Sequence, residues 1–86
     1  MKYSRAGDLL FRAVPGYLAL AKPDGTLTEV HGPGADVWFE IAQPAELEQI
    51  VDNLVRRYLG ERAAMLADVR NLLQSLEEGG YVTNHG

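Results

Sequence analysis

The first third of the chain alternates short apolar runs with turn residues. The runs are LLFRAV (9–14), YLALAK (17–22) and TLTEVH (26–31), separated by Pro15-Gly16 and Pro23-Asp24-Gly25. Pro-Gly and Pro-Asp-Gly favour tight turns, because proline fixes φ and glycine accepts positive φ. Strands joined by such short turns pair with their neighbours in the sequence. The pattern therefore predicts a three-stranded antiparallel meander over about residues 8–31.

Beyond this region the apolar residues recur at helical spacing, from about residue 33 to residue 78. A short first helix is expected behind a proline suited to a first helical turn, with Val37, Trp38 and Ile41 on its apolar side. The second helix begins at Leu47 and ends before Gly60, because its apolar positions follow the i, i+3, i+4, i+7 template up to that glycine. The third runs from about Glu61 to Glu78 and carries a wide apolar stripe.

This order of elements predicts an α+β fold, a meander followed by three helices, with a winged-helix-like arrangement. The 86 residues are few for a domain, so we expect one domain over residues 1–86. The tail YVTN (81–84) is expected either to pack on the domain or to pair with a strand.

Composition narrows the classes of function. Hydrophobic residues make up 47% and charged residues 23%, which is typical of a folded domain. The net charge of −4 argues against a general binder of nucleic-acid phosphates. The chain has no cysteine, which excludes disulfides and thiolate metal sites. No segment approaches the ~20 apolar residues that span a bilayer, so we expect a cytoplasmic protein without membrane contact.

Residues with catalytic chemistry form no recognisable constellation. The only histidines are His31 and His85, too isolated for a metal site of known spacing, and the serines have no nucleophile-elbow context. The glycines of HGPGAD lack a following lysine and the G-x-G-x-x-G pattern. We therefore expect no enzyme activity, no metal and no cofactor.

A winged-helix DNA-binding regulator is a weaker alternative. The wing would follow the recognition helix, but few residues remain after Gly80. The third helix carries two arginines against four acidic residues, so it would repel phosphate. We expect no nucleic-acid partner. A small protein-interaction module remains a further alternative.

The edge of the meander is the most suggestive feature. Its third strand has no proline or lysine to prevent pairing, so it is open to a guest strand. It comprises Thr26, Leu27, Thr28, Glu29, Val30 and His31. One flank of the third helix, either Leu66 with Arg70 or Leu72 with Asp68, is expected to line a groove beside this strand. Such an arrangement binds peptides by strand addition, unless the tail or a second copy covers the edge.

The sequence resembles PqqD-like proteins, the stand-alone peptide chaperones also called RiPP recognition elements. The resemblance covers about residues 9–82 and is carried by three segments, VPGYLALAKPDGTLTEVHGPGADVWFEI, ELEQIVDNLVRRYLG and DVRNLLQSLEEGGYV. It implies a non-catalytic domain of three strands and three helices. Such a domain binds the leader segment of a ribosomally made precursor peptide as an added strand.

The resemblance also implies where the leader lies, against the third strand and the third helix. By position, these peptide-binding residues are Thr26 to His31 together with Arg62, Leu66, Arg70 and Leu73. An unfused domain of this size is most similar to the recognition half of a split lasso-peptide system. That half hands the precursor to a separate cysteine-type leader peptidase and to a cyclase. The alternative is a chaperone that serves a radical-SAM enzyme, as in pyrroloquinoline quinone synthesis.

Overall fold

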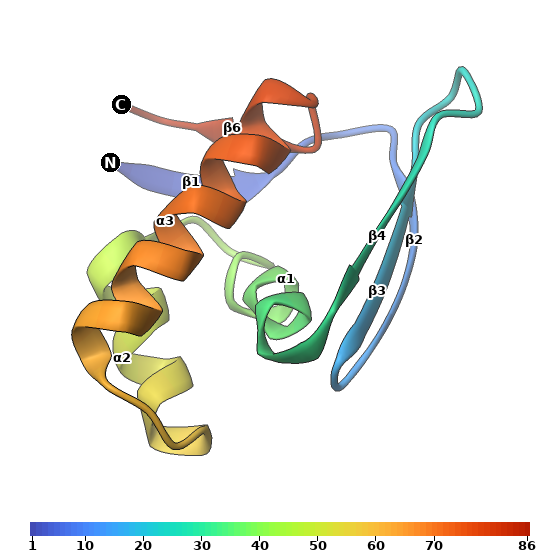
Figure 1. Ribbon diagram of the computed structural model, residues 1–86. Coiled ribbons are helices and arrows are strands. Elements are labelled where there is room, and N and C mark those ends of the chain that lie inside the picture. The colour runs from blue at the N-terminus through green and yellow to red at the C-terminus, as the bar shows by residue number, and fades with distance from the viewer.

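The expected meander is present in the computed structural model, which describes residues 1–86 (Figure 1). Its strands are β2 (Leu10–Val14), β3 (Tyr17–Ala21) and β4 (Leu27–His31), paired antiparallel in the order β2-β3-β4. The central strand β3 turns Leu18 and Leu20 into the core, where both are almost fully buried. Strand β4 begins one residue later than predicted, because Thr26 belongs to the turn.

Both turns of the meander use the residues that the sequence singled out. Gly16 and Gly25 adopt φ values of 81° and 90°, a region that favours glycine. Asp24 accepts a hydrogen bond from the Thr26 N–H at 2.8 Å, and bonding to Thr26 lowers the pKa of Asp24. The turns therefore fix the register that directs alternate residues of β4 to opposite faces of the sheet.

The helical part confirms the prediction of three helices and refines the first. A 3₁₀ segment, η1 (Gly32–Asp36), runs into the single turn of α1 (Val37–Glu40). It is followed by α2 (Leu47–Arg57) and α3 (Arg62–Glu78). In Figure 1, α2 and α3 lie on one side of the molecule and the meander on the other, with α1 between them.

A second small sheet was not predicted. It consists of β1 (Lys2–Arg5), β5 (Ala45–Glu46) and β6 (Val82–Asn84) in the order β5-β1-β6. Strand β6 comes from the tail, which therefore pairs with β1 and lies beside the N-terminus (Figure 1). The short, polar β1 sequence KYSR carries little periodic signal, so only the tertiary structure reveals this sheet.

One apolar core joins both sheets to the helices. Arg5 connects β1 to α1, since its Nε and Nη2 donate to the Trp38 carbonyl oxygen at 3.0 and 2.7 Å. Its guanidinium also lies 4.9 Å from the ring centroids of Trp38 and Phe11, and burial lowers the pKa of Arg5. The core consists of Tyr3, Leu18, Leu20, Ala35, Val37, Trp38, Ile41, Ala45, Ile50, Val51, Leu54, Val69, Leu73, Leu76, Tyr81 and Val82.

Candidate functional site: an open sheet edge beside an apolar groove

Strand β4 has one partner strand and one open side. It pairs only with β3, and the C-terminal strand β6 belongs to the other sheet. The possibility that the tail covers this edge is therefore wrong. An edge strand of this kind presents a row of unpaired N–H and C=O groups to a guest.

The phase of the β3–β4 ladder shows which residues present those groups. Hydrogen bonds flank the ladder at both ends: Lys22 N–H donates to the Thr26 carbonyl at 2.9 Å, and Gly32 N–H donates to the Gly16 carbonyl at 2.9 Å. In an antiparallel ladder the bonded pairs alternate, so Thr28 and Val30 bond to β3. The N–H and C=O groups of Leu27, Glu29 and His31 therefore point to the open side.

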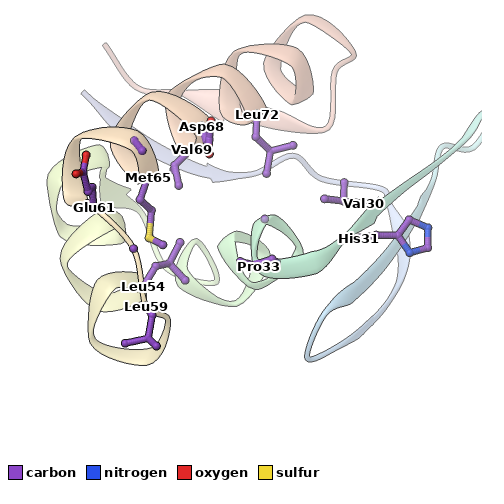
Figure 2. Close-up of a pocket in the computed structure, with 13 residues that line it drawn as sticks. Val30, His31, Pro33, Leu54, Leu59, Glu61, Met65, Asp68, Val69 and Leu72 are labelled. Carbon is purple, nitrogen blue, oxygen red and sulfur yellow. The ribbon is translucent and has the colours of Figure 1, made fainter.

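A groove of about 470 Å³ begins at the C-terminal end of β4 and runs toward the α2–α3 connection (Figure 2). Val30 lines its β4 side, Pro33 and Gly34 of η1 lie along it, and α3 forms the opposite wall. Figure 2 shows the Val30 side chain directed toward the groove and the His31 ring directed away from it. The remaining lining residues are Leu54, Leu59, Gly60, Glu61, Ala64, Met65, Asp68, Val69 and Leu72.

The lining combines an apolar surface with two carboxylates. Met65 and Leu72 are half-buried and exposed Leu59 lies near the far end, so the groove offers apolar surface that a guest could cover. Glu61 and Asp68 are both exposed and form no ion pair. No lysine or arginine lines the groove.

Glu29, the middle residue of β4, lies on the outer face of the sheet, away from the groove. Its Oε2 accepts a hydrogen bond from the Tyr17 hydroxyl at 2.5 Å, and this bond raises the pKa of Tyr17. The His31 ring contacts Tyr17 edge-on, with 5.3 Å between ring centroids. These contacts hold the Glu29 and His31 side chains in place beside the open backbone.

The η1 side of the groove is anchored by buried Asp36, which is 3% exposed. Its Oδ1 accepts the Gly16 N–H at 3.2 Å, and its Oδ2 accepts a very short hydrogen bond from the Tyr58 hydroxyl. The bond to Asp36 raises the pKa of Tyr58, and burial adds to the rise. One carboxylate thus ties η1 to the β2–β3 turn and to the end of α2.

A family model described as coenzyme PQQ synthesis protein D (PqqD) matches residues 16–82. The chain belongs to the PqqD family. The matched range contains β4, η1 and α3, so the whole groove lies within the part that defines the family. Among curated proteins, none matches the chain in sequence.

One solved structure shares this PqqD fold closely. It is described as "TbiB1 in Complex with the TbiA(beta) Leader Peptide" and superposes with a TM-score of 0.83. The alignment covers 96% of this chain and 98% of that chain, at 18% sequence identity. The similarity establishes the shared fold over nearly the whole chain.

The structure separates the site residues that the sequence proposed. Val30 and His31 lie at the groove, and Leu27, Thr28 and Glu29 lie along the edge strand. On α3, Leu66 and Arg70 do not line the groove, and Leu73 is 0% exposed within the core. Arg62 donates to Glu48 Oε2 at 2.7 Å and Asp52 Oδ1 at 2.8 Å, which raises the pKa of Arg62.

The other flank of α3, with Leu72 and Asp68, lies on the groove. The sequence left both flanks open, and the family resemblance favoured the flank that the structure turns toward α2. One signal could have decided between them. Glu48 and Asp52 are spaced i, i+4 on α2 and therefore form an acidic face that suits Arg62. Residues of η1, which the sequence did not name as part of a site, could not be found by any local pattern.

Neither a metal-binding cluster nor a membrane span appears. No group of three or more histidine, aspartate or glutamate side chains is placed to hold a metal ion. None of the helices combines the length and the apolar character needed to cross a bilayer.

Proposed function

We propose that this protein binds the leader segment of a ribosomally made precursor peptide, which adds as a fourth strand along β4. The observation that carries this proposal is the open β4 edge running directly into an apolar groove. Backbone groups of Leu27, Glu29 and His31 would bond to any sequence, whereas the groove would select side chains. Membership of the PqqD family and the likeness to a leader-bound protein support the same function.

The register of β4 determines which side chains of a guest strand would face the groove. Guest residues opposite Thr28 and Val30 would face the interior and the groove, and those between them would lie on the outer face beside Glu29. Side chains of the guest are therefore selected two residues apart. A guest with apolar residues at alternate positions fits this arrangement.

We further propose that the domain performs no chemistry and presents the attached core peptide to separate enzymes in the cytoplasm. A leader peptidase of the cysteine type and a cyclase of lasso-peptide synthesis fit the likeness to the leader-bound structure. The family description favours a second candidate, a chaperone for a radical-SAM enzyme. The reading frames beside the gene distinguish these partners.

The test is a titration with synthetic peptides that match the N-terminal segments of short reading frames beside the gene. Backbone amide shifts should be largest in β4, at Gly34 and along the Met65–Leu72 side of α3. Shifts confined to β2 or to the β5-β1-β6 sheet would contradict the proposed site.

A proline variant tests the backbone bonds themselves. Glu29→Pro removes an N–H that points to the open side, so affinity should fall at least about tenfold. Glu29→Ala controls for the lost carboxylate, and Ala13→Pro removes the equivalent outward N–H from the opposite edge strand, β2. Ala13→Pro should leave the affinity nearly unchanged, and Glu29→Ala should reduce it by clearly less than Glu29→Pro does. Thr28→Pro is unsuitable, because the Thr28 N–H belongs to the ladder with β3.

A further inference from the structure

The charged side chains of the groove lining and of β4 all carry the same sign. Glu61 and Asp68 line the groove, and Glu29 projects from the middle of β4. The one other titratable side chain there is His31, and no lysine or arginine lines the groove. A guest strand would therefore meet carboxylates on both of its faces.

These carboxylates differ from the acidic residues around α2. On that side, Glu40 pairs with Arg57 at 2.8 Å, and Arg62 pairs with both Glu48 and Asp52. Glu61 precedes Arg62 in the chain, yet the Arg62 guanidinium is directed to α2 and leaves the groove acidic. Neither Glu61 nor Asp68 forms an ion pair within the protein.

Carboxylates beside the apolar walls of the groove favour a cationic ligand. Low-dielectric walls focus the field of the carboxylates, which attracts cations and raises the association rate. Like charges directly opposite each other on paired strands are destabilising, so an acidic guest residue opposite Glu29 is disfavoured.

We propose that the bound segment is cationic: an apolar stretch that enters the groove at alternate positions, with lysine or arginine opposite Glu29 and beside Asp68 and Glu61. The inference rests on the proposed function, because it specifies the ligand class of the same groove. It predicts which precursor segments bind and excludes acidic ones of equal hydrophobicity.

A displayed library of random peptides, longer than β4, tests this against three forms of the protein. They are the wild type, a groove variant (Glu61→Gln with Asp68→Lys) and a control variant (Glu77→Gln with Glu78→Lys). All four substituted residues are exposed, and the two variants raise the net charge equally. The control removes acidic charge from the far end of α3, so it measures general attraction to an acidic protein.

The wild type and the control variant should enrich alternating apolar peptides that carry lysine or arginine at two kinds of position, opposite Glu29 and facing the groove. The groove variant should lose the groove-facing preference and keep the one opposite Glu29, which it leaves intact. An enriched peptide should bind about two- to fivefold more weakly for each carboxylate removed, and the difference should vanish at high salt. Apolar enrichment without a charge preference, or a groove-facing preference that persists in the groove variant, overturns this inference alone. Failure to enrich any peptide overturns the proposed function and this inference with it.

Discussion

The two flanks of α3 carry similar residue types, but their surroundings differ. On one flank Arg62 is held by two carboxylates of α2, and Leu66 packs against the core. On the other flank, Leu72 packs against the core as well, but it and Asp68 also line the groove beside β4. A helix with a wide apolar stripe has enough apolar surface for a core and a binding wall, and its neighbours decide which flank does which.

Truncating the adjacent leucines Leu72 and Leu73 should separate the binding role of α3 from its role in the core, and it should give the largest effects. Leu73 is 0% exposed, so Leu73→Ala should lower the free energy of unfolding by about 2–5 kcal/mol. Leu72 is half-buried at the groove, so Leu72→Ala should lower it by less and should mainly weaken peptide binding. Urea unfolding and peptide titration measure the two effects. Equal stability losses would mean that the groove flank is also core.

Removal of the Asp36 carboxylate tests whether its two hydrogen bonds stabilise the η1 side of the groove. Asp36→Ala leaves the Gly16 N–H and the Tyr58 hydroxyl without their acceptor, and it should lower the free energy of unfolding by about 1–3 kcal/mol. Urea unfolding measures the loss, and Asp24→Ala in the exposed turn is the control. An unchanged unfolding midpoint would show that the anchor is dispensable.

The same anchor predicts a dependence on alkaline pH. The pKa of Tyr58 is raised in the fold above its ordinary value of 10.0. The stabilisation is therefore complete below pH 10 and is lost as the pH rises through the raised pKa. Tyr58→Phe should remove this part of the alkaline loss of stability. A wild type and a variant that lose stability in parallel would contradict the assignment.

A methyl group placed in the groove should have a smaller effect, confined to binding. A Cβ at Gly34 would lie 3.2 Å from Leu72 Cδ2 and 3.6 Å from Val30 Cγ1. Gly34→Ala therefore narrows the groove by about one methyl group, and peptide affinity should fall about fourfold. Gly7→Ala is the matched control, because a Cβ there meets nothing within 4 Å.

The smallest effect is expected on the flank that faces α2. Arg62 is exposed, and exposed ion pairs contribute little. Arg62→Ala should leave both the melting temperature and the peptide affinity nearly unchanged. A clear loss of affinity would place the guest on this flank, as the family resemblance first suggested.

Several elements follow directly from local sequence. The Pro15-Gly16 and Pro23-Asp24-Gly25 turns set the meander and its register, because these residues favour the required dihedral angles. The apolar period of residues 47–58 and the glycine at 60 set α2. The absence of proline and lysine from β4 indicated the open edge, and the structure places nothing beside it.

Other features depend on contacts between distant residues. Strand β1 exists because its backbone pairs with β5 and β6, which lie about 40 and 80 residues away, and the KYSR sequence does not encode those partners. The α3 flank at the groove was likewise undecided, because an amphipathic stripe fixes a face but not its neighbours. The sequence determined the meander, the helices and the unprotected edge through local dihedral preference and periodicity. Only tertiary packing decided that α2 takes the Arg62 flank and leaves Asp68 and Leu72 beside β4.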